Sequence, residues 1–252
     1  HNKFSDWTDA EFKATLTYKS EGQIGEVVEQ NLQATYSPVN WIDNGCISPI
    51  QHQGQCGSCW SFSATGSMEG RHQIKSGKLV SLSEQQLVDC SGPQGNMGCN
   101  GGLMDYAFTY VKSNGGIDTE ADYAYTAMDG QCNKAKAGKH AITISGYKDV
   151  TPDSETQLAS AVAQGPVSVA IEADQSGFQF YSSGVFSGPC GTQLDHGVLA
   201  VGYGVQDSKK YWIVKNSWGA SWGDKGYILL SRGSSGTKGL CGIAMQPSYP
   251  IA

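Results

Sequence analysis

The pattern of hydrophobic and polar positions differs between the two halves of the chain. In the N-terminal half, apolar residues recur with helical spacing from about residue 58 to Gly77, and a glycine at that place is typical of a helix C-cap. Similar patterns predict a helix over 83–90, with a serine as its N-cap, and a third over 101–116, closed by an Asn-Gly pair. This half is therefore predicted to be mainly helical.

Beyond Gly146 the pattern changes to short apolar runs. The segments 165–173, 196–204 and 210–219 are rich in β-branched and aromatic residues and are bounded by glycine. Runs of this length and composition are typical of strands. We therefore expect helices in the first half and mainly β structure in the second.

The first 36 residues look different from the rest. Residues 1–17 carry apolar side chains three to five positions apart, which predicts a short amphipathic element. Residues 18–36 are polar with scattered glycines, so we expect an exposed connector, with the globular part beginning near 37–41. The opening "HNKFSDWTDAEF" is neither a start methionine nor a signal peptide, and we expect it to come from inside a longer precursor.

Length and charge argue against a protein that binds nucleic acid or that binds or spans a membrane. The 252 residues suffice for one domain of two halves or for two small domains. Lys and Arg total 17 against 23 acidic residues, and no basic block occurs, so nucleic acid and anionic membranes are poor candidate partners. No apolar run reaches the ~18 residues of a membrane span. Eight cysteines indicate an oxidising compartment.

The stretch "QGQCGSCWSFS", residues 53–63, places Cys56 and Cys59 three positions apart. A zinc site needs a second closely spaced pair of ligands, and the other cysteines do not provide one. A redox disulfide of the thioredoxin kind needs a βαβ unit nearby, and nothing before residue 56 has that pattern. The third interpretation is one structural cysteine beside one reactive cysteine.

A reactive cysteine needs a group that favours its thiolate. Cys59 is expected at a helix N-terminus, which lowers a thiol pKa, as does a neighbouring imidazolium. Of the five histidines, His196 lies at the head of an apolar strand in "LDHGVLAVGYG". Asn216, in "NSWGASWG", ends another strand, and its amide could hold an imidazole in one tautomer.

These three stretches resemble the signature regions of papain-like cysteine proteases. His196 follows Cys59 by 137 positions and Asn216 by 157, close to the spacing of that family. The match runs from about Pro38 to the end of the chain, and "GCNGGLMDYAF", "NGGIDTEADYAY" and "CGIAMQPSYP" are most similar to the cathepsin L-like branch.

The resemblance implies a fold and a division of the chain. The fold is α+β with two domains, a mainly helical left domain and a β-barrel-like right domain, and the active-site cleft lies between them. The peptidase domain is 35–252, with a helical half at about 44–145, a β half at about 146–246, and terminal segments that cross over. Residues 1–34 are expected to be the C-terminal remnant of an inhibitory propeptide and a linker. The helical region that precedes such a remnant lies outside the sequence.

The resemblance also implies the roles of the catalytic residues. Cys59 attacks the scissile carbonyl, His196 moves the proton, Asn216 orients His196, and Trp218 shields that contact from water. Gln53 and the Cys59 backbone N–H donate to the developing oxyanion. A plain polar loop residue is the alternative for Gln53. No metal and no cofactor are implied.

Substrate contacts follow from the same resemblance. Two glycines would let a peptide backbone approach and pair as a strand, although a plain turn is the alternative. Apolar residues match the pocket for the second residue before the cut, the P2 residue, although each could instead be core. Gln246 matches the floor of this pocket, disfavours arginine there and would be a buried polar group to satisfy. The substrate-binding set is Gly57, Gly101, Gly102, Leu103, Met104, Ala170, Leu194, Asp195, Gly197, Trp218 and Gln246.

Six cysteines allow fifteen pairings from sequence alone. The resemblance implies Cys56–Cys99, Cys90–Cys132 and Cys190–Cys241. Cys46 is left over, either as a small buried side chain or as a reactive or intermolecular thiol.

The expected activity is that of a cysteine endopeptidase that prefers apolar residues at P2. A catalytically silent binding or scaffold module is the alternative, and a disulfide oxidoreductase is a third class. Expected partners are protein and peptide substrates, the chain's own propeptide as inhibitor, and cystatin-type inhibitors. We expect a monomer in a lysosome, in an acidic vacuole or outside the cell. Residues 1–34, called the leader below, carry three basic and six acidic residues, so acidification is expected to loosen the leader and permit cleavage within 32–36.

Overall fold

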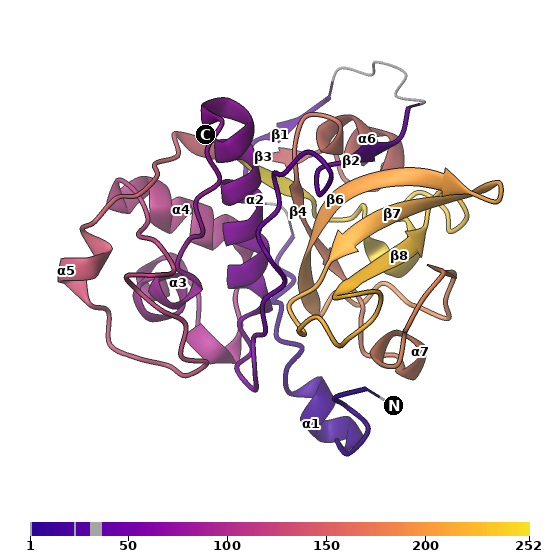
Figure 1. Ribbon diagram of the computed structural model, residues 1–252, viewed down its shortest axis with the longest axis horizontal. Helices are drawn as coiled ribbons and strands as arrows, with labels where there is room; N and C mark the ends of the chain where they lie inside the picture. Colours follow the sequence, from indigo (N-terminus) through magenta and orange to yellow (C-terminus); the bar gives the residue numbers. More distant parts are fainter. Residues whose placement is uncertain (1, 23, 31–36) are drawn as a thin grey trace.

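The computed structural model describes residues 2–22, 24–30 and 37–252. Helices α2–α5 gather on one side of the molecule, and the long strands lie on the other side together with α6 and α7, with the N-terminal segment at one edge (Figure 1). The helices are α1 (Asp9–Lys13), α2 (Cys59–Ser76), α3 (Glu84–Cys90), α4 (Met104–Asn114), α5 (Lys134–Ala137), α6 (Glu155–Val162) and α7 (Ser176–Gln179), with short 3-10 turns at Gly92–Gln94, Gly98–Asn100 and Leu240–Gly242. The strands are β1 (Val27–Val28), β2 (Val39–Asn40), β3 (Gly146–Val150), β4 (Val167–Ile171), β5 (Val185–Phe186), β6 (His196–Gln206), β7 (Lys209–Lys215), β8 (Tyr227–Ser231) and β9 (Ser248–Ile251).

The three predicted helices, now α2, α3 and α4, and the three predicted strands, now β4, β6 and β7, lie where the sequence pattern places them. Helix α2 ends at Ser76, and Gly77 caps it with a φ of 76°, a left-handed conformation that glycine adopts without strain. Ser83 caps α3 by accepting a hydrogen bond from the Gln86 backbone N–H.

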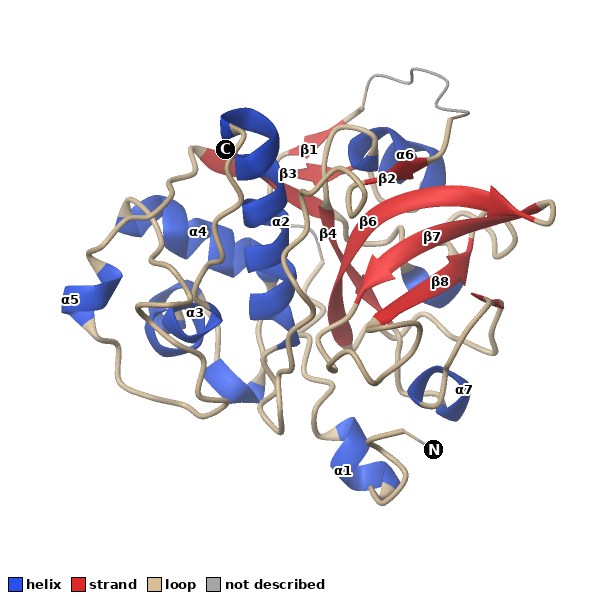
Figure 2. Cartoon of the chain, in the orientation of Figure 1, coloured by secondary structure: helices blue, strands red, loops and turns tan. Residues whose placement is uncertain are grey.

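One sheet joins the described strands in the order β1-β3-β9-β4-β6-β7-β8-β5, and β2 pairs with β6 (Figure 2). The pairs among β4, β6, β7 and β8 are antiparallel, whereas β1–β3 and β5–β8 are parallel. Strand β6 is the longest, and its buried first residue, His196, lies beside α2. The strand therefore delivers that side chain to the boundary between the two halves.

Helix α2 is the main contact between the halves. A Cβ added to Gly66 would lie 2.8 Å from Leu199 of β6, and one added to Gly70 would lie 2.6 Å from the Pro166 ring. The absence of side chains at these positions lets the helix pack closely against the sheet, which places its N-terminus at the junction.

Two clusters of buried apolar residues fill the two halves. One surrounds α2, α3 and α4, and the other lies among the sheet, α6 and α7. The leader contributes to both, because Phe4 and Phe12 belong to the second cluster and Tyr18 to the first.

The expectation for the leader is therefore only partly right. The amphipathic element contains only a five-residue helix, α1. Residues 18–36 are not simply an exposed connector, because Tyr18 and Gln30 are buried and Val27–Val28 pairs with β3. Tertiary contacts with the rest of the chain outweigh the polar composition of this segment. The expected cleavage region, 32–36, lies outside the described residues.

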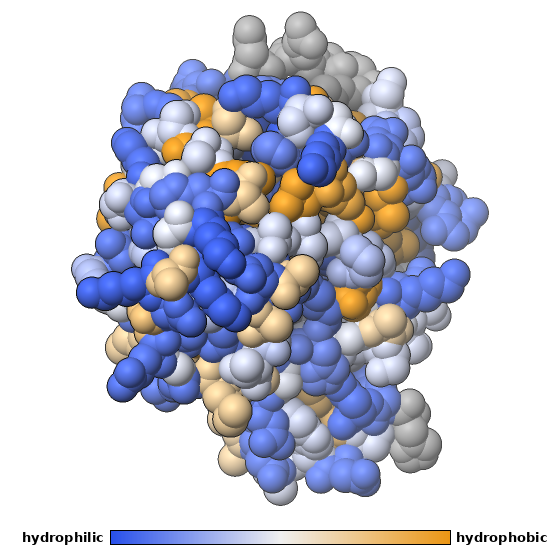
Figure 3. Space-filling view, turned by 60° about the vertical axis from the view of Figure 1, so that its left-hand side comes forward, coloured by the Kyte–Doolittle hydropathy of each residue, from blue (hydrophilic) through white to orange (hydrophobic). Residues whose placement is uncertain are grey.

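The outer surface shown in Figure 3 is mainly hydrophilic, with apolar residues confined to limited areas. No helix in the described part of the chain combines the length and the apolar character that crossing a bilayer requires.

Candidate active site

Cys59 is the first residue of α2 and is completely buried. Its Sγ accepts a hydrogen bond from the Gly197 backbone N–H at 3.3 Å, which joins the N-terminus of α2 to the start of β6. A helix N-terminus carries a partial positive charge and stabilises an anion placed there. The fold thus puts a cysteine where its thiolate would be favoured once it meets solvent.

His196 is also completely buried, one residue before that contact. Its Nε2 lies 2.8 Å from Asn216 Oδ1, and Trp218 stacks on the ring with centroids 4.7 Å apart. Because Oδ1 can only accept, the proton resides on Nε2 and Nδ1 keeps its lone pair. Nδ1 has no partner within the described part of the chain. This arrangement leaves one ring nitrogen free to take a proton.

Gln53 is held in place by four hydrogen bonds. The Ser217 Oγ donates to its Oε1 at 2.7 Å, and its own backbone N–H donates to the Ser217 carbonyl at 2.8 Å. Its Nε2 then donates to the Cys56 carbonyl at 3.1 Å and to the carbonyl of leader residue Thr15 at 3.2 Å. The side-chain amide is therefore aimed at two carbonyl oxygens, one of which belongs to the leader.

The leader runs across this junction from Thr15 to Ser20. After Thr15, the Tyr18 N–H donates to the Asp195 carbonyl at 2.9 Å, and the Lys19 N–H donates to the Gly102 carbonyl at 3.3 Å. Tyr18 and Gly102 form a parallel bridge. The leader thus bridges the helical half, through Gly102, and the β half, through Asp195.

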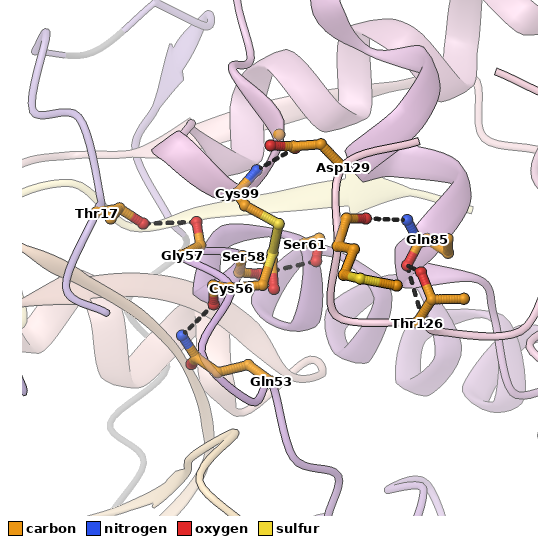
Figure 4. The surroundings of a disulfide bond; sticks show 12 residues. Thr17, Gln53, Cys56, Gly57, Ser58, Ser61, Gln85, Cys99, Thr126 and Asp129 are labelled. Atoms are coloured by element: carbon orange, nitrogen blue, oxygen red, sulfur yellow. Dashed lines mark hydrogen bonds between the residues drawn. A yellow bond between two sulfur atoms is a disulfide. The ribbon is translucent and has the colours of Figure 1, made fainter. Parts of the chain in front are cut away.

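Glycines allow this close approach. A Cβ on Gly101 would lie 2.1 Å from the Thr17 carbonyl oxygen, and one on Gly57 would lie 2.4 Å from Thr17 Oγ1. Thr17 Oγ1 donates to the Gly57 carbonyl at 2.5 Å, beside the disulfide between Cys56 and Cys99 (Figure 4). Both glycines therefore line the path of the leader.

An apolar pocket receives the Tyr18 side chain, which is 9% exposed. Its hydroxyl donates to Gln246 Oε1 at 2.7 Å, and Gln246 Nε2 donates to Ser20 Oγ at 3.2 Å. The Met104 sulfur lies near Gly197, where a Cβ would be 3.1 Å away. The buried apolar cluster that contains Tyr18 also includes the predicted pocket residues Leu103, Met104, Ala170 and Leu194.

A second part of the leader packs on the β half near Trp218. Phe4 and Phe12 meet the indole edge to face, with centroids 5.0 and 5.4 Å away. Lys3 Nζ lies 2.9 Å from His52 Nε2, while His52 Nδ1 accepts from the Gly54 N–H. Burial, followed by the Lys3 charge, lowers the pKa of His52.

Burial dominates the protonation of the central residues. It raises the pKa of Cys59 to about 11, although backbone N–H groups of Gly197, Thr17 and Trp60 favour the thiolate. Burial lowers the pKa of His196 to about 4, against the opposing effect of the Asn216 hydrogen bond. The nearby Asp195 has its pKa raised to about 7, also by burial. Beneath the leader, the thiol and the imidazole are therefore both neutral at pH 7.

The structure joins Cys56 to Cys99, Cys90 to Cys132 and Cys190 to Cys241. Cys59 is a free thiol, so it shares no disulfide with Cys56. Cys46 is free and buried, and its Sγ donates to Gln73 Oε1 at 2.7 Å. Within the described residues, no three His, Cys, Asp or Glu side chains are grouped so that they could hold a metal ion.

Sequence reasoning missed several supporting residues. Ser217 follows Asn216 in the sequence and was not singled out, although its hydroxyl orients Gln53. The buried Lys215 donates to the Ser48 carbonyl at 2.9 Å, and Ser48 Oγ donates to Glu69 of α2 at 2.6 Å. A lysine that directly follows the apolar run Trp212–Val214 was the available signal for this link between the halves.

Comparisons with known proteins agree with this geometry. A family model described as papain family cysteine protease matches residues 36–251. Cysteine endopeptidase RepA of Oryza sativa subsp. japonica is 53% identical over 268 residues, covering 99% of this chain and 70% of that protein. KDEL-tailed cysteine endopeptidase CEP2 of Arabidopsis thaliana is 50% identical over 262 residues, covering 99% of this chain and 72% of that protein. The solved structure of a recombinant stem bromelain precursor has a TM-score of 0.93 at 41% identity, covering 100% of this chain and 82% of that one.

Proposed function

The chain belongs to the papain family of cysteine proteases and is a cysteine endopeptidase with the papain-like α+β fold, and from this premise we propose that Cys59 and His196 perform its chemistry. One observation carries the assignment. Cys59 at the start of α2 accepts a hydrogen bond from Gly197, the residue after His196 at the start of β6, and Asn216 fixes the tautomer of that histidine.

The reaction begins when His196 Nδ1 takes the Cys59 proton, which gives a thiolate–imidazolium pair. The sulfur attacks the scissile carbonyl carbon, and the carbonyl electrons move to oxygen as the C–S bond forms. The imidazolium then gives its proton to the amide nitrogen as the C–N bond breaks, leaving a thioester and a free amine. His196 next deprotonates a water molecule, which attacks the thioester and releases the acid and the thiol.

Other residues position these groups. Gln53 Nε2 and the Cys59 backbone N–H donate to the oxyanion, and the Thr15 carbonyl marks where that oxygen would lie. Asn216 orients His196, and the stacked Trp218 keeps water from that contact. Asp195 and Gly102 hold the substrate backbone by the carbonyls that now accept from the leader, and Gly57 and Gly101 leave room for that backbone to approach.

The leader acts as an inhibitor because it runs in the opposite direction to a substrate. In a cleavable peptide, the carbonyl in the oxyanion site belongs to the residue after the one in the P2 pocket. In the leader, the carbonyl at Gln53 belongs to Thr15, three residues before Tyr18 in the pocket. The segment fills the cleft without offering a correctly oriented peptide bond.

We also propose where the enzyme acts and with what. The three disulfides fit an oxidising compartment, and the similarity to a KDEL-tailed endopeptidase supports the secretory pathway or a vacuole. Its proposed partners are protein and peptide substrates and, once the cleft is open, cystatin-type inhibitors. We propose that it works as a monomer.

The test is covalent labelling of the activated protein. The full chain is incubated at about pH 5 with mild reductant until the leader is removed, and then treated with a thiol-directed epoxide peptide mimic. Mass spectrometry should find one adduct, on Cys59, that is lost in His196→Ala. If the leader is gone and Cys59 is free but unlabelled, the catalytic assignment is wrong and a silent binding module takes its place.

A further inference from the structure

The P2 pocket holds a tyrosine whose hydroxyl has a dedicated partner. Tyr18 is almost fully buried among apolar side chains, and its hydroxyl lies 2.7 Å from Gln246 Oε1. Burial raises the pKa of Tyr18 well above its ordinary range, so the hydroxyl stays protonated and acts as the donor. The neutral amide of Gln246 is thus satisfied by a phenol.

The backbone at Tyr18 is held in the cleft by both halves of the molecule. Its N–H donates to the Asp195 carbonyl at 2.9 Å, and it bridges to Gly102. The side chain therefore enters the pocket from the cleft, between the helical half and the β half. The leader runs in the opposite direction to a substrate, so the residues on either side of Tyr18 differ from those on either side of a substrate P2 residue. The pocket groups that a tyrosine side chain meets are the same in both cases.

We infer that Gln246 makes this endopeptidase prefer tyrosine to phenylalanine at the P2 position of its substrates. The inference deepens the proposed function and rests on it. The two aromatic rings would bury the same apolar surface against Leu103, Met104 and Leu194, so only the hydroxyl distinguishes them. Phenylalanine would leave the Gln246 oxygen without the phenol that satisfies it here.

The expected selectivity is modest because Gln246 is only half-buried. Water can replace part of the lost hydrogen bond, so the net contribution should be that of an ordinary neutral one. This corresponds to roughly a threefold to tenfold preference in kcat/KM for tyrosine over phenylalanine.

The experiment uses the full chain after acid removal of the leader and three peptides that differ only at P2, with tyrosine, phenylalanine or leucine. The variant Gln246→Met removes the amide but keeps the length of the side chain. The matched control, Gln206→Met, changes an exposed glutamine at the far end of β6. The Tyr/Phe ratio of kcat/KM should be about three to ten in the wild type and in Gln206→Met, and about one in Gln246→Met.

A wild-type Tyr/Phe ratio of kcat/KM of one or less would overturn the inference, and so would a high ratio that persists in Gln246→Met. If the leucine peptide is still cleaved, the proposed function stands in either case. Cleavage of none of the three peptides, together with no epoxide adduct on Cys59, would overturn both.

The leader offers a second readout in the uncleaved chain. Tyr18→Phe removes only the hydroxyl, and it should speed epoxide labelling of Cys59 about threefold to tenfold with glutamine at position 246. In the Gln246→Met background, the same change should have no effect. If Tyr18→Phe speeds labelling of Cys59 equally with and without Gln246→Met, the hydrogen bond between Tyr18 and Gln246 is not the source of selectivity.

Discussion

Removal of the leader should convert a neutral pair into an ion pair, and this change can be measured directly. In the covered chain, the Cys59 pKa of about 11 leaves about one thiolate in 10,000 molecules at pH 7. The His196 pKa of about 4 leaves about one imidazolium in 1,000. Both groups are therefore uncharged beneath the leader.

The magnitudes show why the pair stays neutral. Moving the proton from sulfur to nitrogen against a gap of about seven pKa units costs roughly 10 kcal/mol. Attraction between two unit charges about 4 Å apart returns about 4 kcal/mol at the effective dielectric of a protein. Because the attraction is smaller than the cost, only access to solvent and substrate groups can favour the ion pair.

The assay is the ultraviolet absorbance of the thiolate between pH 5 and 8, taken as the difference between the wild type and Cys59→Ser. The covered chain should show no thiolate signal from Cys59 in this range, and the signal should appear once the leader is removed. The Cys59→Ser subtraction removes the tyrosine contribution. Equal thiolate signals before and after leader removal would refute the reasoning.

Three further predictions concern the supports of the site. Asn216→Ala should lower kcat of the activated enzyme about tenfold to 100-fold with KM nearly unchanged in steady-state kinetics, because the hydrogen bond to His196 is lost; an unchanged kcat would contradict its role. Gly25→Ala should loosen the leader and speed its removal in an electrophoretic time course, because a Cβ there would lie 2.5 Å from the Tyr147 ring; removal at the wild-type rate would argue against it. His52→Gln should shift leader removal to lower pH, because the neutral amide cannot gain the charge that repels the leader lysine; an unchanged pH midpoint would count against this.

Local sequence carried enough information for the framework of the fold. Gly77 ends α2 because a left-handed residue is needed there, and the Ser83 hydroxyl starts α3 because the first turn needs an acceptor. Such signals depend on neighbours within a few residues. Tertiary structure brings Cys59 to Gly197, the residue after His196 and 138 positions from Cys59, and the family resemblance indicated this juxtaposition.

The burial of Tyr18 in the leader could not be predicted from its neighbours either, because it also depends on tertiary structure. Tyr18 is followed by polar residues and has no apolar periodicity around it, so its surroundings indicate an exposed segment. Its burial comes from a pocket built by α4, the start of β6 and Gln246, which lie 85 or more positions further along the chain. Polar composition describes a segment in isolation, whereas burial here is a property of the cleft that receives it.

The pH dependence of leader release is set by the difference in bound protons between the covered chain and the open chain. When the leader covers the cleft, Cys59 and His196 share one titratable proton, which is on the Cys59 sulfur. When the leader is removed they still hold one, now on the His196 ring. Because the number of protons does not change, this pair gives leader release no pH dependence near neutrality. Asp105 opposes release in acid, because burial raises its pKa to about 7 and the covered chain binds the extra proton. Acid favours release only where the covered state binds fewer protons. That holds for His52, whose pKa burial lowers. His52 contacts Lys3 of the leader, so acid should free this end of the leader first, while the backbone bonds of Tyr18 across the cleft yield only afterwards.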